Sequence, residues 1–285
     1  MPSSVMQGKQ KGVTFMADKL IIARSIEEAL QARCPDAAFL AGGTEINRLG
    51  SFVAADTLIS LKKIGKLRGI KKDGGKVWIG AYTTFQEIVD CPEVPEWLRD
   101  ACRLMASRTK RNMATLGGNI AILRDDSYVA PALIAARATV VYTEESGKNK
   151  ECCICKYMEA RQEGKLGNGL ILRIGIDPNR KVLLKRYANT AMSHSVMNLA
   201  YGFDPDGKAV SIGAALKNTG LFKLRSAEEL IASDPDVSEE TIMEWAKQFD
   251  AEIPTDMFGS EEYKRYLLGT TIAKFIADAR KEVLA

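Results

Sequence analysis

The chain has 285 residues, of which 46% are hydrophobic and 27% charged, values ordinary for a soluble globular protein with room for two domains. Its 40 Lys and Arg against 36 Asp and Glu leave a net charge of +4, too small to predict nucleic acid or a membrane surface as a partner. No apolar run is long enough to predict membrane insertion. Six cysteines without a signal peptide predict reduced thiols and a cytoplasmic protein.

The first half of the chain alternates helix and strand signals. Capping boxes predict short helices after Ser25 and Thr84. Apolar runs of strand length predict strands at residues 37–42, 57–61, 76–81, 138–143 and 169–176. Helical spacing of apolar residues predicts helices at 95–107 and 128–137.

The pattern changes from about residue 181. A turn at Asp204-Pro-Asp-Gly207 separates two apolar runs and predicts an antiparallel hairpin. Helices are expected near residues 226–232, 239–249 and 260–283. We therefore predict an α+β protein with a flexible leader (1–13), a first domain with two subdomains (14–180) and a second domain of antiparallel sheet and helices (181–285).

Two glycine pairs stand in similar surroundings, in LAGGTEI (residues 40–46) and NMATLGGNIA (residues 112–121). Glycine permits positive φ and close backbone approach, so successive N–H groups can converge on an anion. A strand-to-turn connection explains either pair alone more simply. Neither pair belongs to a GxGxxG or GxxxxGK[ST] motif. Together the pairs would suit a pyrophosphate held from both sides.

The two segments LAGGTEI and SRTKRNMATLGGNIA resemble the flavin-binding signatures of the FAD subunits of molybdenum hydroxylases, the xanthine dehydrogenase and carbon monoxide dehydrogenase family. KVWIGAYTTFQEI, PALIAARATVVY and EEYKRYLLGTTIAKFIADA are similar to later segments of that family, in the expected order. The similarity spans roughly residues 14 to 280 and is greatest to small FAD subunits of xanthine dehydrogenase-like or selenate reductase complexes. It implies a two-lobed FAD-binding domain of the vanillyl-alcohol-oxidase (PCMH) type at 14–180.

The resemblance also implies FAD contacts at particular positions. The first signature supplies Leu40, Ala41, Gly42, Gly43, Thr44, Glu45 and Ile46, and the second supplies Ala114, Thr115, Gly117, Gly118 and Asn119. Ile171 matches a strand that contacts the flavin ring, and Arg186 or its neighbour Lys185 matches a basic residue near that ring. Many relatives place an aspartate near the adenosine ribose where this chain has Tyr128, so either Asp126 supplies that carboxylate or it is missing.

The implied function is that of an FAD-binding electron-transfer subunit and flavin-dependent oxidoreductase. Electrons would arrive from a molybdenum-cofactor large subunit through the clusters of a [2Fe–2S] small subunit, and the flavin would pass them to NAD⁺ or another soluble acceptor. The flavin carries the chemistry, so no catalytic acid or base is expected in the chain. Two alternatives remain: an assembly module that binds no FAD, and a self-sufficient flavin oxidase.

Cysteine and histidine side chains are common metal ligands. Cys152, Cys153 and Cys155 lack the CxxC spacing that lets two thiolates face one metal, so plain thiols and no metal site are expected. His194 is the only histidine. A surface or strand-end position is favoured for it over a place beside the flavin.

Overall fold

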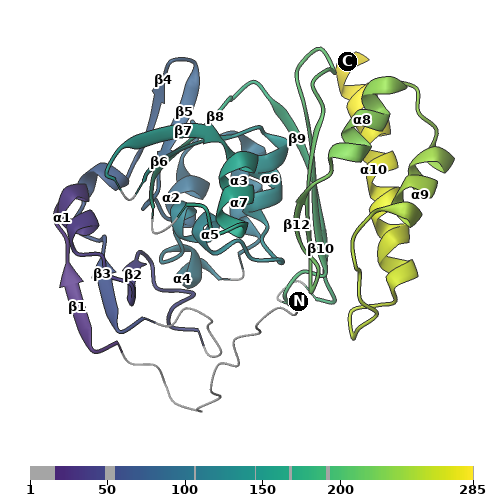
Figure 1. Ribbon diagram of the computed structural model, residues 1–285. Coiled ribbons are helices and arrows are strands. Elements are labelled where there is room, and N and C mark those ends of the chain that lie inside the picture. Colours follow the sequence, from purple (N-terminus) through teal and green to yellow (C-terminus); the bar gives the residue numbers. More distant parts are fainter. Residues whose placement is uncertain are drawn as a thin grey trace.

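The computed structural model describes residues 17–48, 55–105, 107–144, 146–166, 169–190 and 193–284. The leader expected at residues 1–13 lies outside this part of the chain. The described residues form three sheets with helices packed between and beside them (Figure 1). No helix in this part of the chain is both long and apolar enough to cross a membrane.

The first sheet is small and parallel. Its order is β1 (Lys19–Ile22), β3 (Thr57–Ser60), β2 (Ala37–Leu40), with α1 (Ile26–Gln31) between β1 and β2. The Ser25 hydroxyl caps α1 by accepting a hydrogen bond from the Glu28 N–H, as the capping box predicts. The core of this sheet includes Leu67 and Leu170 from the next subdomain, so the two subdomains pack directly together.

The second sheet has five antiparallel strands. Its helices pack against the sheet and against each other. The strand order is β4 (Ile70–Asp73), β5 (Lys76–Gly80), β8 (Leu170–Ile176), β6 (Thr139–Thr143), β7 (Asn149–Cys153). A 3₁₀ turn (Gly65–Leu67) precedes β4. The helices are α2 (Phe85–Asp90), α3 (Glu96–Arg103), α4 (Arg108–Arg111), α5 (Leu116–Ile122), α6 (Val129–Ala135) and α7 (Ile154–Gln162).

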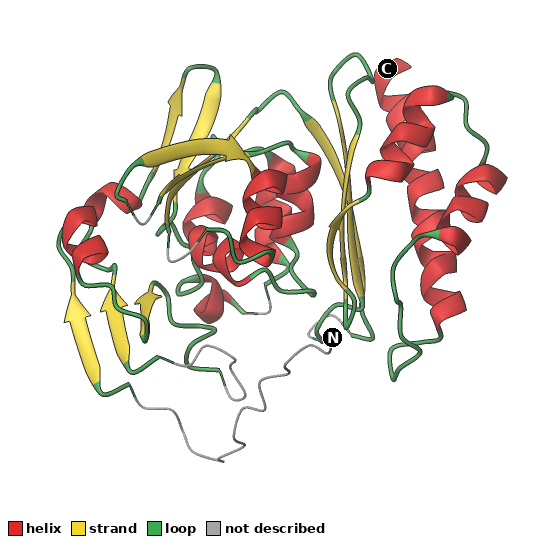
Figure 2. Ribbon diagram, viewed as in Figure 1, coloured by secondary structure: helices red, strands yellow, loops and turns green. Residues whose placement is uncertain are grey.

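The third sheet is antiparallel, in the order β12 (Gly220–Lys223), β11 (Ser211–Leu216), β10 (Met197–Phe203), β9 (Lys181–Tyr187). It lies between two groups of helices (Figure 2). Ala200 and Ala215 face α6, whereas Leu199 and Ala214 face the C-terminal helices α8 (Arg225–Ser233), α9 (Glu239–Gln248) and α10 (Glu261–Leu284). All seven residues of β10 are therefore buried.

The α+β class and the hairpin at residues 204–207 are confirmed, because β10 pairs with β11 across that turn. The capping box at Thr84 is also formed, with the Glu87 side chain returning to the Thr84 N–H. The second glycine pair does not form the strand-to-turn connection that would explain either pair alone. Gly117 and Gly118 lie in the first turn of α5, because Thr115 acts as a helix N-cap.

Candidate cofactor-binding site

Two cavities meet where the two glycine segments come together. The first has a volume of about 200 Å³ and the second about 240 Å³. Both are lined by the same six residues, here called the waist: Phe39, Ala41, Ile46, Gly118, Ala121 and Ile122. The waist joins the end of β2 to α5, so an elongated ligand could pass between the cavities there.

The first glycine pair follows β2 and does two separate things. A Cβ on Gly42 would lie 1.6 Å from the carbonyl oxygen of Met113, so only glycine allows the two backbones to touch. Gly43 has φ +71°, a left-handed conformation that disfavours other residues. Glycine is therefore required at position 42 for the contact between the two segments and favoured at position 43 for the turn.

The two glycines of the second pair, Gly117 and Gly118, also have different roles. The Gly117 N–H donates to the Ala81 carbonyl oxygen at 2.8 Å, and a Cβ on Gly117 would lie 2.6 Å from the Ala81 Cβ. A Cβ on Gly118 would meet only the Thr115 hydroxyl at 2.8 Å and, more distantly, the Ala41 Cβ at 3.9 Å. Gly117 therefore packs against the segment that follows β5, whereas Gly118 leaves the waist open.

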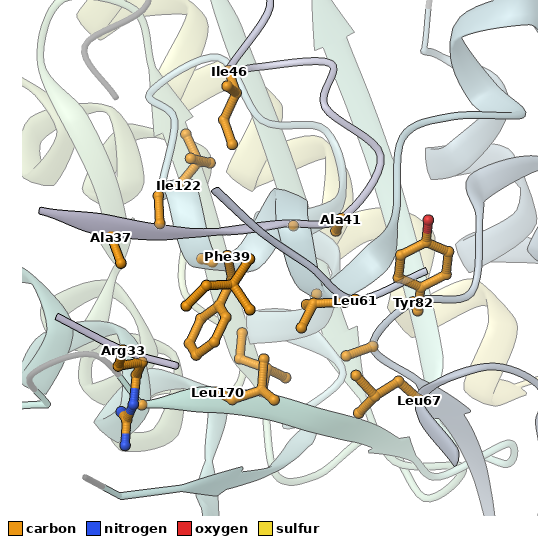
Figure 3. A pocket seen from close by; sticks show the side chains of 18 of the residues that line it. Arg33, Ala37, Phe39, Ala41, Ile46, Leu61, Leu67, Tyr82, Ile122 and Leu170 are labelled. Carbon is orange, nitrogen blue, oxygen red and sulfur yellow. The ribbon is translucent and has the colours of Figure 1, made fainter. Parts of the chain in front are cut away.

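The first cavity is mainly apolar. Figure 3 shows Phe39, Leu61, Leu67, Tyr82 and Leu170 pointing into it. These side chains come from β2, the segments after β3 and β5, the 3₁₀ turn and β8. Ile171 also lines this cavity, as does Arg161, whose Nε donates to the Ala121 carbonyl oxygen at 2.6 Å. A cavity of this composition suits a flat aromatic ring.

The second cavity has many polar and charged side chains on its wall. Hydroxyl, phenol and amide groups on its wall come from Thr44, Thr115, Asn119, Ser127 and Tyr128. Ionisable groups come from Glu45, Arg48, Lys110, Arg124, Asp126 and His194. The Ser127 hydroxyl donates to the Asn119 amide oxygen at 2.9 Å, which fixes the two side chains relative to each other. This wall suits a ligand with several hydroxyl groups and a polar ring edge.

An ion-pair network centred on the buried Asp126 lies at the second cavity. Arg124 donates to both carboxylate oxygens of Asp126, from Nε to Oδ1 at 2.7 Å and from Nη2 to Oδ2 at 2.6 Å. Its Nη1 also lies 3.3 Å from Glu45 Oε2 in the first glycine loop. Burial raises the pKa of Asp126, but hydrogen bonds and charge from Arg124 outweigh burial, so that this pKa lies below its ordinary value.

The third sheet closes the second cavity. The Asn198 amide on β10 donates to the backbone oxygens of Asp126 at 3.2 Å and Ser127 at 3.1 Å. Lys217, which follows β11, lies 2.8 Å from Asp125. Ser193 and His194, which precede β10, form part of the wall. The shape of this cavity therefore depends on all three sheets.

Of the two basic residues Lys185 and Arg186, Arg186 is the one that lies next to the second cavity. Its guanidinium lies 5.6 Å from the ring centroid of Tyr128, a wall residue, and its Nε donates to the Ser195 hydroxyl at 3.1 Å. Lys185 points to the opposite face of β9, where its ammonium lies 5.5 Å from the ring of Tyr187. Arg186 itself does not line either cavity.

The structure brings together most of the residues expected from the sequence. The second cavity is lined by Ala41, Gly42, Gly43, Thr44, Glu45, Ile46, Ala114, Thr115, Gly118, Asn119 and Asp126. Gly117 and Ile171 line the first cavity, and Leu40 lines neither. Ile171 and Arg186, both expected near one flavin ring, thus stand at different cavities.

Sequence reasoning missed the apolar walls and the role of Arg124. The RDD run at residues 124–126 hinted at a local ion pair, but nothing in the sequence joined Arg124 to Glu45. All six cysteines are unpaired thiols, and burial raises the pKa of Cys155 to about 11. Among the described residues, no group of three or more His, Cys, Asp or Glu is placed to hold a metal ion.

Residues 15–176 match the family model for the FAD binding domain in molybdopterin dehydrogenase. The uncharacterised protein YgfM of Escherichia coli K12 is 27% identical over 262 residues, which cover 90% of this chain and 94% of YgfM. The carbon monoxide dehydrogenase medium chain of Hydrogenophaga pseudoflava is 36% identical over 91 residues, which cover 30% of this chain and 32% of that protein.

Solved structures show the same fold over almost the whole chain. A chain of carbon monoxide dehydrogenase from Hydrogenophaga pseudoflava matches with a TM-score of 0.79 at 20% identity, covering 94% of this chain and 98% of that one. A chain of quinoline 2-oxidoreductase from Pseudomonas putida 86 matches with a TM-score of 0.80 at 20% identity, covering 96% and 100%. At this identity the likeness concerns the fold.

Proposed function

The chain belongs to the family of FAD-binding domains in molybdopterin dehydrogenases, and from this premise we propose that it is the electron-transfer flavoprotein subunit of a molybdenum hydroxylase complex. The observation that carries the proposal is the pair of unlike cavities joined at a waist. FAD has the matching form, with two ring systems at the ends and a pyrophosphate in the middle.

The residues present fit this cofactor. Gly118 leaves space at the waist that a Cβ would begin to fill, and the Gly43 turn lines the second cavity beside it. We place the pyrophosphate at the waist, where backbone can approach it closely. Thr44 offers a hydroxyl next to this position.

We further propose that the adenine lies in the first cavity and the isoalloxazine with its ribityl chain in the second. The first cavity is the smaller one and has fewer charged and hydroxyl side chains on its wall, as suits adenine against Tyr82 and Leu170. The second is larger and offers the hydroxyl and amide groups that ribityl hydroxyls need. In this orientation Arg186 and Tyr128 stand near the flavin ring, and Ile171 stands near the adenine.

Bound FAD supplies two-electron chemistry at its ring, and the protein supplies binding, orientation and local charge. We propose that electrons reach it from a partner with iron–sulfur clusters, supplied by a molybdenum subunit, and leave to NAD⁺ or another soluble acceptor. The printed name of one relative, a medium chain, supports a role within a complex. The six unpaired thiols support placing the protein in the cytoplasm, a reducing compartment.

The test is reconstitution. Purified protein is incubated with FAD, freed of excess cofactor by gel filtration, and examined by absorbance before and after denaturation. We expect a flavin spectrum, release of the flavin on denaturation, slow reduction by NADH or dyes, and no turnover of purines or aldehydes by this chain alone. Protein that takes up no FAD would overturn the proposed function. Efficient oxidation of an organic substrate by the chain alone would instead identify a self-sufficient oxidase.

A further inference from the structure

His194 is held against the second cavity by a buried carboxylate. Its Nδ1 lies 2.8 Å from Asp126 Oδ2. The His194 side chain is 68% exposed, whereas that of Asp126 is 4% exposed. A mostly exposed imidazole is thus tethered at one nitrogen to an anchor inside the protein. The residue lines the cavity assigned to the isoalloxazine.

Asp126 has little capacity left for another ligand. Oδ1 accepts from Arg124 Nε, and Oδ2 accepts from Arg124 Nη2 and faces His194 Nδ1. With both oxygens engaged and the group buried, Asp126 is poorly placed to accept ribose hydroxyls. Its geometry instead suits orienting the imidazole, as a carboxylate does when it accepts a hydrogen bond from one ring nitrogen of a histidine.

This contact leaves Nε2 of His194 as the ring nitrogen that can exchange a proton. Histidine is the side chain whose charge ordinarily changes between about pH 5 and 8. The charged groups around it include Asp126 in contact, Arg124 behind that carboxylate, and Lys217, whose Nζ lies 3.9 Å from Asp126 Oδ2. Arg186 on β9 is also close, since it donates to the carbonyl oxygen of Ser193, the residue before His194. Asp125 and Glu45 pair with Lys217 and Arg124 and partly balance them.

We propose that His194, with Asp126 as its positioning residue, is the proton-exchanging group of the flavin site. The inference rests on the proposed function. Reduction of a bound flavin by two electrons from an iron–sulfur partner, with one proton from water, would add one negative charge in the cavity that His194 lines. His194 takes up a second proton from water and provides the opposing charge. When the two electrons leave to NAD⁺, the proton of the ring leaves with them as hydride, and with an acceptor of electrons alone it returns to water. In both cases His194 returns its own proton to water.

The experiment is a potentiometric titration of the FAD-loaded protein between about pH 5 and 8. The parent is compared with His194→Gln, which cannot become charged, and His194→Lys, which remains charged over this range. We expect an additional slope in the parent's plot of midpoint potential against pH. Its potential should approach that of His194→Lys at low pH and that of His194→Gln at high pH. Each variant should lack the additional slope.

A matched control is Lys208→Gln, which removes one positive charge from an 82% exposed side chain in the β10–β11 turn. It should keep the parent's profile. Identical profiles for the parent and His194→Gln, both loaded with FAD, would overturn this inference and leave the proposed function standing. Protein that binds no FAD at all would overturn both.

Discussion

The two cavities share six residues yet differ in chemistry and in construction. The first is lined mainly by apolar side chains and is built from the first sheet, β8 and the segments beside them. The second is charged and also depends on residues at the third sheet, including Ser193 and His194. The difference indicates that one end of the ligand is held mainly by apolar contact, and the other by groups that can respond to its charge.

The largest effect is expected from closing the waist. Gly118→Leu would place a branched side chain where the two cavities meet, next to Ala41 and the Thr115 hydroxyl. Overpacking of about 3 kcal/mol should weaken FAD binding roughly 100-fold. Isothermal titration calorimetry measures the loss, and circular dichroism checks the fold. Gly65→Leu is the control, since a Cβ at Gly65 meets nothing within 4 Å. Tight FAD binding by Gly118→Leu would place the pyrophosphate away from the waist.

The ion pair of the second cavity should contribute strongly to stability. Asp126→Asn removes the carboxylate that Arg124 and His194 share, at a cost of about 2 kcal/mol in the free energy of unfolding at neutral pH. Urea denaturation at several pH values measures this difference between parent and variant.

The pH dependence follows from the direction of the shift. The pKa of Asp126 is lower in the folded state, so its stabilisation is fully present above the unfolded pKa of about 3.9. It is lost as the pH falls through the folded pKa. The difference from Asp126→Asn should therefore shrink below about pH 4. A difference that stays constant down to acid pH would mean that the carboxylate is not stabilised by charge.

The orientation of FAD in the two cavities can be tested by measuring the binding of ADP and of FMN, each of which represents one half of FAD. Tyr82→Ala removes an aromatic side chain that lines the first cavity and not the second. Loss of contact with a base should weaken ADP and FAD binding about tenfold, since stacking of a base on an aromatic ring contributes about 1–3 kcal/mol. FMN, which lacks the adenosine, should bind Tyr82→Ala as it binds the parent. The reverse result, with FMN weakened and ADP unaffected, would exchange the two ends of FAD.

The smallest effect is expected for Thr44→Val, which removes one hydroxyl from the wall of the second cavity and keeps the shape of the side chain. Loss of one neutral hydrogen bond of about 1 kcal/mol should weaken FAD binding about fivefold. Fluorescence titration with FAD is sensitive enough to resolve this change. Unchanged affinity would mean that only backbone groups of this loop contact the cofactor.

Much of the fold was predictable because local signals agree with tertiary packing. The capping box at Thr84 and the turn at residues 204–207 carry their own hydrogen-bonding or turn chemistry. Strands β1 and β4 were missed because they are short edge strands with mostly exposed residues, and so show little apolar pattern. Their existence depends on a neighbouring strand that the local sequence does not reveal.

The sequence indicated that the two glycine pairs belong to a binding site, but it did not indicate the structural role of each glycine. Gly42 and Gly117 are required by contacts with Met113 and Ala81, which lie far away in the chain. Likewise, whether Lys185 or Arg186 lies near the second cavity depends on which face of β9 is turned towards that cavity. This face is set by the pairing of β9 with β10. The site was therefore hard to predict because it depends on contacts between segments that are far apart in the sequence. The types of residue in it were easier to recognise.

The contact of Gly42 with Met113 also has a consequence for the order of folding. These residues are separated by 71 positions in the chain, so the waist cannot form until a long loop has closed. Contacts of such sequence separation form slowly compared with local helices and turns. A cofactor that needs the waist would bind only chains in which this closure is complete. The appearance of bound flavin during refolding would then time the assembly of the first two subdomains.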